Sequence, residues 1–377
     1  MKKAVLILAT VLALISCSQL PSREKAQLPQ QERVQHPQRE AAQRPSQEKA
    51  QRPKREAGTG VSQPSGTSRR EKGVIEIGTL RGPSAIEMVR MIDSLSEGKN
   101  GMRVRIYEGP LEMRKEMIRG RVDYAVMPSA MAALQYNKGI DYRVAALTIE
   151  GGLILCGTDT TIHSITDLRG RTISVSTRGT TPDILLRYLL SRSETGIFHS
   201  GRDEAADFSP VSGGAQTIID YRFPTPSDLA NAAIAGRTQF CILPEPLASQ
   251  VLGLNPDLHR LLDIGREWEK SEGMPLPETL LLSKAGADKA TTDAVLRALE
   301  SSSLWVSANP EKAASLAVKH GINPDSAAVI NATKSCAFNV IRTKEAEKEI
   351  KYYLRVILAC CPEALGGRMP DETFYEK

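Results

Sequence analysis

Apolar and polar positions follow two alternating patterns from residue 73 onward. Apolar runs of strand length are separated by stretches in which apolar residues recur at helical spacing, which predicts βαβ units and mostly parallel sheets. Because about 305 residues exceed what one hydrophobic core usually serves, we expect an α/β fold with two lobes. The expected strands cover 75–80, 103–107, 123–127, 172–176, 217–223, 239–243 and 278–283, and the expected helices follow 83 and 227 and cover 111–119, 129–137 and 182–190.

The last hundred residues have a different pattern, with helical periodicity over nearly all of their length after the strand at 278–283. In the final stretch, helical spacing predicts a buried stripe made of Ile350, Leu354, Ile357 and Leu358. We therefore expect a helical C-terminal tail that covers the first lobe, with lobe 1 over 73–158 plus 278–377 and lobe 2 over 159–277. The expected helices of this tail cover 289–308, 311–320, 324–333 and 344–359.

The amino end has the features of an export signal. Lys2 and Lys3 precede an apolar run from Ala4 to Ile15, which is too short to cross a bilayer as a mature helix and predicts a signal peptide over 1–16. Cys17 follows the small residue Ser16, which resembles the bacterial lipobox. A diacylglyceryl group and an N-acyl chain on Cys17 would give the two or more hydrophobic anchors that stable membrane attachment needs.

A repeat of eight residues fills most of the segment between the anchor and residue 73. A proline in every unit interrupts any helix, and the units hold almost no apolar residue to bury, so we expect 17–72 to be a disordered, lipid-anchored tether. As a random coil its 55 residues after Cys17 would span roughly 40 Å. The repeated positions are Glu24, Glu32, Glu40 and Glu48, with Pro29, Pro37, Pro45 and Pro53 in step.

The net charge of +5 does not describe the folded body. The signal peptide carries +2 and residues 18–72 carry +6, which leaves −3 for 73–377. The basic tether could lie against anionic lipid headgroups. Nothing in this distribution indicates a nucleic-acid partner.

Cysteine and histidine spacing gives no sign of catalysis or metal binding. Five cysteines remain besides Cys17, an odd and sparse set that does not form a disulfide framework. Cys156 and Cys241 lie in apolar runs and are expected to be buried thiols, whereas a bridge from Cys336 to Cys360 or Cys361 stays open. Neither a GxSxG motif nor a phosphate-binding P-loop occurs. We therefore expect no enzyme, no catalytic residue, no metal and no cofactor.

Ligand-binding residues are expected where strands meet helices, because helix N-termini present unpaired N–H groups beyond the carboxyl ends of strands. The most specific junction contains Arg178, Gly179, Thr180 and Thr181, which would favour an anionic or strongly polar group. The same residues also fit a well-capped surface helix that binds nothing. Glu245 could accept a hydrogen bond from a ligand amine, or it could cap a helix. Candidates at the other junctions are Arg81, Gly82, Ser84, Met127, Ser129 and Ala130.

Several runs of the body are similar to one family of transport proteins. The chain from 73 to 377 resembles the nitrate, sulfonate, taurine and thiamine-pyrimidine-precursor group of ABC transporter solute-binding proteins. The resemblance implies the type II periplasmic-binding-protein fold, whose lobes close on a ligand by hinge motion, and ABC permease and ATPase subunits as partners. The similar runs are DLRGRTISV at 167–175, GTTPDILL at 179–186, GRVDYAVMP at 120–128, AGRTQFCILPEP at 235–246 and GGRMPD at 366–371.

The resemblance implies a monomeric, periplasmic or cell-surface lipoprotein that binds a small polar or anionic solute, such as a sulfonate, a carboxylate or a pyrimidine precursor. It maps the cleft loops onto 81–84, 127–130, 178–181 and 244–245. Two features depart from the family: a longer polar segment at 194–216, whose role is open, and Arg178, where a small residue is common. An adhesive or sensory surface lipoprotein with the same fold is the alternative.

Overall fold

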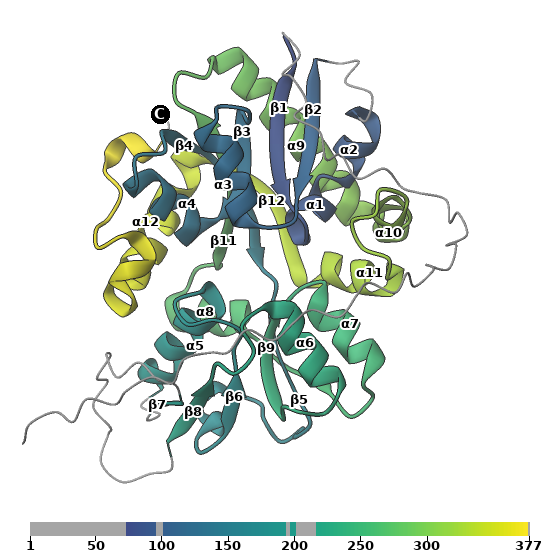
Figure 1. Cartoon of the computed structure of the whole chain (residues 1–377), viewed down its shortest axis with the longest axis vertical. Helices are drawn as coiled ribbons and strands as arrows, with labels where there is room; N and C mark the ends of the chain where they lie inside the picture. Colours follow the sequence, from purple (N-terminus) through teal and green to yellow (C-terminus); the bar gives the residue numbers. More distant parts are fainter. Residues whose placement is uncertain (1–72, 96–100, 194–196, 201–215, 376–377) are drawn as a thin grey trace, which may run out of the picture. The chain divides into compact units, whose positions relative to one another are not determined.

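The computed structural model describes residues 73–95, 101–193, 197–200 and 216–375 (Figure 1). Every described residue belongs to one compact unit of the chain. The predicted signal peptide, Cys17 and the repeat tether lie outside the described residues, and so does most of the 194–216 segment.

The first sheet has six strands in the order β12-β4-β11-β3-β1-β2. Strands β1 to β4 run in one direction, and β11 and β12 run against them. The strands are β1 (Ile75–Leu80), β2 (Met102–Tyr107), β3 (Tyr124–Pro128), β4 (Tyr142–Gly151), β11 (Pro277–Lys284) and β12 (Cys336–Arg342).

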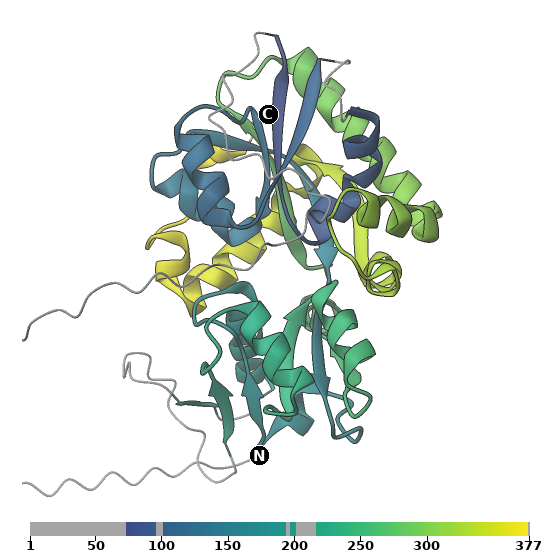
Figure 2. The same ribbon diagram turned by 45° about the vertical axis from the view of Figure 1, so that its right-hand side comes forward.

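Helices cover both faces of this sheet (Figures 1 and 2), as βαβ units require. One face carries α3 (Pro110–Ile118), α4 (Ser129–Asn137) and α12 (Thr343–Cys360). The other face carries α1 (Pro83–Glu87), α2 (Val89–Leu95), α9 (Lys289–Ala308), α10 (Pro310–Lys319) and α11 (Ser326–Ser335).

The second sheet has the order β10-β5-β9-β6-β8-β7, in which only β5 runs against its neighbours. Its strands are β5 (Leu153–Gly157), β6 (Thr172–Ser174), β7 (Ile197–Ser200), β8 (Thr217–Asp220), β9 (Phe240–Pro244) and β10 (His259–Asp263). Helices α5 (Thr181–Arg192) and α8 (Ile264–Glu272) pack on one face, and α6 (Pro226–Ile234) and α7 (Leu247–Leu254) on the other. Three short 3₁₀ turns are η1 (Ile165–Leu168), η2 (Pro362–Leu365) and η3 (Glu372–Phe374).

One hydrophobic core, called the shared core below, contains side chains from both sheets. Met127 of β3, Ile242 of β9 and Ile357 of α12 are among its buried members. Within it the fully buried ring of Trp268 on α8 meets the ring of Tyr353 on α12 edge-on, with centroids 5.6 Å apart. Apolar packing therefore continues from the first sheet into the second.

The chain passes from the first sheet to the second at Gly151 and Gly152, which have φ angles of 75° and 87°. A Cβ atom on Gly152 would lie 2.6 Å from the Sγ atom of Cys336. Only glycine combines this backbone conformation with so close an approach, so the crossing depends on it.

The α/β organisation predicted from the sequence is confirmed, but the prediction of an almost wholly helical tail is wrong. Residues 336–342 form β12, which extends the edge of the first sheet by pairing with β4. Strands β4, β7 and β10 and helices α7 and α8 were also not predicted. The Cys336 bridge left open above does not form, because Cys336 is buried on the α9 face of the sheet whereas Cys361 belongs to the shared core.

Candidate functional site

The predicted ligand residues lie at four junctions, where β1, β3, β6 and β9 lead into α1, α4, α5 and α7. The carboxyl ends of these strands are the edges at which α/β proteins usually bind ligands. The four junctions differ in how many of their polar groups already form hydrogen bonds or ion pairs within the protein.

The junction before α5 is held in place by the buried carboxylate of Asp183. Its Oδ2 atom accepts the N–H of Gly179 at 2.7 Å and pairs with Arg187 at 2.9 Å, and its Oδ1 atom accepts the hydroxyl of Tyr221 at 2.6 Å. Gly179 has a φ angle of 77°, which favours glycine. These bonds therefore hold the loop from 178 to 181 against α5.

The first turn of α5 keeps its N–H groups available. Thr180 is the N-cap residue but makes no side-chain capping bond, since its hydroxyl donates to the carbonyl of Thr177 at 2.6 Å. The first N–H groups of a helix have no acceptor within the helix. This end of a helix of 12 residues can therefore stabilise an anionic group.

Arg178 lies half-buried in the same loop. The thiol of Cys361, together with smaller effects that include the charge of Arg178, lowers the pKa of Glu363. Arg178 therefore lies close to η2 of the C-terminal tail. It adds positive charge to the end of α5 at which anions are favoured.

The β3–α4 junction is more closely packed than predicted. Ser129 is buried and donates its hydroxyl to the carbonyl of Pro277 at 2.6 Å, which ties α4 to the start of β11. Met127 is fully buried in the shared core, and Ala130 is 8% exposed. These three positions shape the end of the sheet mainly through packing.

Arg81 is largely occupied by contacts within the protein. Its guanidinium forms a two-point ion pair with Glu108, with Nη2 to Oε1 at 2.6 Å and Nε to Oε2 at 2.8 Å. Its Nη1 atom donates to the carbonyls of Gly321 and Ile322 beyond α10. Gly82 and Ser84 belong to the start of a helix of only five residues. A ligand contact by Arg81 stays a prediction, and its visible role is to join β1 to α10.

Glu245 performs the second of the two roles that its sequence left open. Its buried carboxylate accepts the N–H and the hydroxyl of Ser249, each at 3.1 Å, and therefore caps α7. It also forms an ion pair with Arg260. These bonds leave its carboxylate few free acceptor positions for a ligand amine.

Two polar groups near the α5 junction were not predicted. One carboxylate oxygen of Glu278 on β11 is inaccessible to solvent and has no hydrogen-bond partner among the described residues, and burial raises the pKa of Glu278 to about 8. Tyr353 is fully buried on α12. Burial, followed by the charge of Glu278, raises the pKa of Tyr353, whereas a hydrogen bond with the side chain of Thr181 lowers it. Thr181 at the start of α5 and Tyr353 on α12 are therefore neighbours.

The sequence carried only a weak signal for this pair. Glu278 is a carboxylate at the start of an apolar strand, and Tyr353 lies three residues after Ile350 on the stripe predicted to be buried. Neither forms a motif. Their proximity depends on the pairing of β11 with β3 and on the packing of α12, which local periodicity does not encode.

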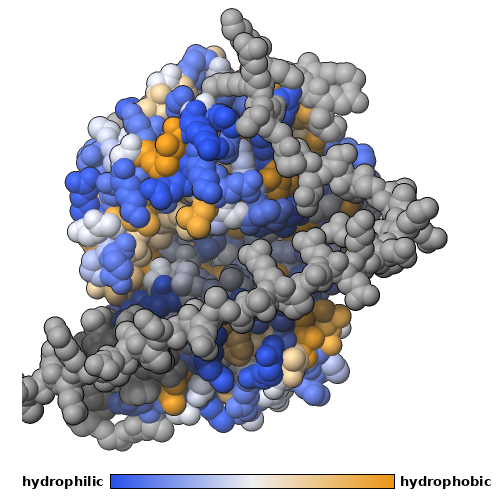
Figure 3. Space-filling view, in the orientation of Figure 1, coloured by the Kyte–Doolittle hydropathy of each residue, from blue (hydrophilic) through white to orange (hydrophobic). Residues whose placement is uncertain are grey.

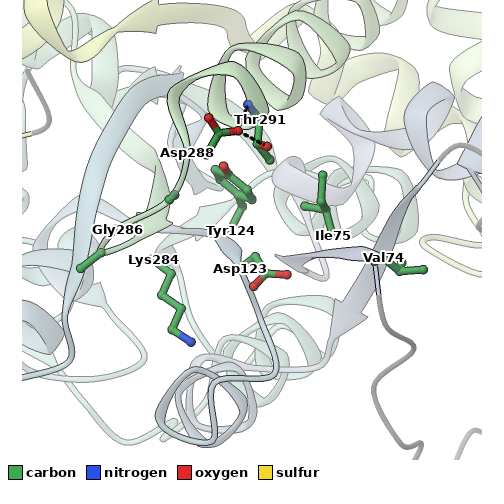
Figure 4. A pocket seen from close by; sticks show the side chains of 11 residues that line it. Val74, Ile75, Asp123, Tyr124, Lys284, Gly286, Asp288 and Thr291 are labelled. Carbon is green, nitrogen blue, oxygen red and sulfur yellow. Dashed lines mark hydrogen bonds between the residues drawn. The ribbon is translucent and has the colours of Figure 1, made fainter.

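Two surface pockets lie elsewhere. One pocket of about 440 Å³ opens beside Gly73 at the amino ends of β1 and β3. At its rim the Asp288 carboxylate accepts the N–H of Thr291, whereas the Lys284 side chain points away from both (Figure 4). The other, of about 320 Å³, lies at the crossing between the sheets and is lined by Glu150, Asp263 and Lys334, among others. Neither includes a predicted ligand residue.

Three further observations concern only the part of the chain that the structure describes. No group of three or more histidine, cysteine or acidic side chains there is placed to hold a metal ion. None of its helices has both the length and the apolar character needed to cross a bilayer. The face of the body seen in Figure 3 is largely hydrophilic, with scattered hydrophobic residues.

No family model and no curated protein matches the chain, but many solved structures do. A protein described as an ABC transporter from Parabacteroides distasonis is 26% identical, with a TM-score of 0.68, over 81% of this chain and 99% of that one. The periplasmic aliphatic sulphonate binding protein SsuA from Escherichia coli is 13% identical, with a TM-score of 0.62, over 81% and 93%. The ligand-binding component of an ABC-type import system from Staphylococcus aureus is 14% identical, with a TM-score of 0.58, over 81% and 97%.

These similarities cover nearly the whole length of the matched chains, so both sheets and their helices take part in them. At the lower identities the likeness concerns the fold alone. The resemblance drawn from the sequence is confirmed: the described part of this chain has the two-lobed α/β fold of ABC transporter solute-binding proteins.

Proposed function

We propose that this chain is the extracytoplasmic solute-binding component of an ABC importer and captures a small polar or anionic organic solute by hinge closure. Structural neighbours that are ligand-binding transport components support a transport role rather than an enzymatic one. One neighbour is described as an aliphatic sulphonate binding protein, and we extend that class of anionic solute to this chain. Permease and ATPase subunits are the proposed partners.

The observation that supports this role best is the preformed start of α5. Asp183 fixes the loop, Arg178 adds positive charge, and Thr181 lies beside Tyr353 of α12, a helix that packs on the other sheet. An anion bound there would contact elements that belong to both sheets. That is the arrangement through which a solute can favour the closed form of a hinged protein.

Binding can be tested with the purified full chain and a panel of small sulfonates, carboxylates and aminopyrimidines. A true ligand at about 100 times its Kd should raise the melting temperature by roughly 5 °C. Arg178→Ala should weaken binding about tenfold, because a charge-assisted hydrogen bond is lost. Arg237→Ala, an exposed arginine beyond α6, is the control and should bind like the parent. A chain whose melting temperature no member of the panel changes would contradict the proposed function.

Lipid anchoring through Cys17 is a separate part of the proposal and rests on the sequence. Mass spectrometry of the mature amino-terminal peptide should show a chain that begins at Cys17 and carries a diacylglyceryl group with an added acyl chain. Cys17→Ala should release the protein from membranes without altering ligand binding. A mature protein that retains residues 1–16 or lacks lipid would refute the anchor alone.

A further inference from the structure

Two cysteines face each other across the second sheet. Strands β5 and β9 lie side by side (Figure 1) and pair antiparallel in a register that sets Cys156 directly opposite Cys241. Residues directly opposite in such a pair project to the same face of the sheet. Both side chains accordingly belong to one hydrophobic cluster, together with Leu229 of α6 and Val251 of α7. Both are fully buried, and both thiols are free.

The backbone spacing of this pair suits a disulfide. On one side of it the N–H of Glu245 donates to the carbonyl of Gly152 at 2.9 Å. On the other side the N–H of Thr158 donates to the carbonyl of Gln239 at 3.2 Å. Hydrogen-bonded pairs recur at every second residue of an antiparallel ladder, so the two cysteines form such a pair, whose Cα atoms lie about 5.5 Å apart. Disulfides usually join Cα atoms roughly 4.4–6.8 Å apart.

The two thiols are also in contact. A hydrogen bond with the side chain of Cys241, followed by burial, raises the pKa of Cys156. Cys336 provides the contrast, because burial is the main cause of its raised pKa and it lies on the α9 face of the first sheet. The sulfur atoms of Cys156 and Cys241 are therefore neighbours on the same side of the sheet.

The burial of the pair determines when it can react. The thiolate is the form that attacks a disulfide, and a raised pKa makes the thiolate of Cys156 rare. A fully buried thiol is also out of reach of an oxidant in solution. Oxidation should therefore occur while the chain folds, before α6 and α7 cover the pair.

We propose that Cys156 and Cys241 form a cross-strand disulfide as the chain folds outside the cytoplasm. The proposal rests on the extracytoplasmic location proposed above and not on the binding of a solute. The oxidant is another disulfide, that of glutathione or of a thiol–disulfide oxidoreductase. One cysteine attacks it and the second resolves the mixed disulfide. The two cysteines lose two protons and two electrons, which convert the disulfide of the oxidant into two thiols.

The bridge would cross-link two parts of the second sheet. The contact between β5 and β9 joins the antiparallel pair β10-β5 to the parallel strands β9, β6, β8 and β7. Cys156 and Cys241 are 85 positions apart in the sequence. Closing so long a loop restricts the unfolded chain and stabilises the folded one, so the oxidised chain should melt about 5–10 °C above the reduced chain.

The test compares two preparations of the purified full chain, each reduced, unfolded in urea and refolded. One is refolded with reduced and oxidised glutathione, the other with dithiothreitol. Both are then alkylated with iodoacetamide in denaturant and mapped by mass spectrometry without reduction. The glutathione preparation should contain a linked pair of peptides that carry Cys156 and Cys241, lighter by two hydrogen atoms than the free peptides together. It should also have the higher melting temperature.

The double variant Cys156→Ala with Cys241→Ala should melt at the same temperature in both preparations. Cys336→Ala is the matched control and should keep the difference seen in the parent. The peptide map of the parent is decisive even where a variant does not fold. Alkylation of both Cys156 and Cys241 in the glutathione preparation, or a bridge from either to another cysteine, would overturn the proposal.

The same map of the chain from cells that are quenched with acid and alkylated should show the same linked peptides. Free thiols there, beside a bridge in the glutathione preparation, would overturn the extracytoplasmic location and the proposal with it. Free thiols in the glutathione preparation would leave the proposed solute binding intact. A bridged chain that binds no solute of the panel would contradict the proposed function alone.

Discussion

Replacing Glu87 with glutamine should make the stability of the folded chain less dependent on pH. Glu87 lies on α1, fully buried against α9, and only one of its carboxylate oxygens has a hydrogen-bond partner among the described residues. Burial raises the pKa of Glu87 from 4.5 to about 8, although its bond with Ser303 acts in the opposite direction. The folded state therefore keeps a proton that the unfolded chain has lost over this interval.

The sign and size of the effect follow from this difference. The folded state holds the Glu87 proton more tightly than the unfolded chain does, since the pKa is raised by burial. The protonated carboxyl therefore contributes fully to the free energy of unfolding below about pH 4.5, and this contribution is lost as the pH rises through about 8. The free energy of unfolding should fall by up to about 1.4 kcal/mol per pH unit in that interval, hence by about 2 kcal/mol between pH 6 and 8 and by about 3 kcal/mol by pH 9, where the change levels off. Glu87→Gln, which imitates the protonated acid, should remove this share and lie within about 1 kcal/mol of the parent at pH 6.

Urea unfolding at pH 6, 7, 8 and 9, followed by the fluorescence of the fully buried Trp268, measures the effect. The parent should lose about 3 kcal/mol more than Glu87→Gln between pH 6 and 9. Glu300→Gln, an exposed position on α9, is the control and should follow the parent curve. Parallel curves for the parent and Glu87→Gln would show that the buried carboxyl reaches water before unfolding, and the reasoning would be refuted.

Three further predictions follow from the junctions and the crossing. Asp183→Asn should lower the free energy of unfolding by about 3–5 kcal/mol, because it leaves the buried Arg187 without its ion-pair partner; an unchanged urea midpoint would contradict this. Gly152→Ala should cost about 1–3 kcal/mol in the same measurement, because a Cβ atom would lie 2.6 Å from the Cys336 Sγ atom at a φ angle of 87°. Burial raises the pKa of Cys336, so its thiol should resist iodoacetamide at pH 8 until the chain unfolds, and peptide mapping of the labelled protein would reveal early modification.

The spacing of apolar residues predicted the limits of a helix correctly where a proline or a capping residue marks its start. Helices α4 and α9 have the predicted limits, since Pro128 precedes the first and the Asp288 side chain accepts N–H groups at the start of the second. Strand β4 was missed because polar residues such as Arg143 and Glu150 break its apolar pattern and only Gly152 separates it from β5. Strand β12 exists through its pairing with β4, a contact between segments far apart in the sequence.

The candidate site was predictable in position but not in detail. The strand–helix junctions follow from fold class, so the α5 loop could be selected from sequence alone. The state of each side chain depends on distant partners: Arg81 is engaged by carbonyls near residue 321, and Glu245 by Arg260. Glu278 could not be found without the tertiary structure, because a buried carboxylate oxygen without a partner leaves no pattern in a sequence.

The network around Asp183 has a consequence for the speed of solute capture at the proposed site. A loop that Asp183 already holds in place would lose little conformational entropy on binding, so association could approach the rate set by diffusion and electrostatic attraction. Differences in affinity between competing molecules would then appear in their residence times. In the proposed role, release of the solute would have to separate α5 from α12, which the Arg187 bond to the carbonyl of Cys360 joins.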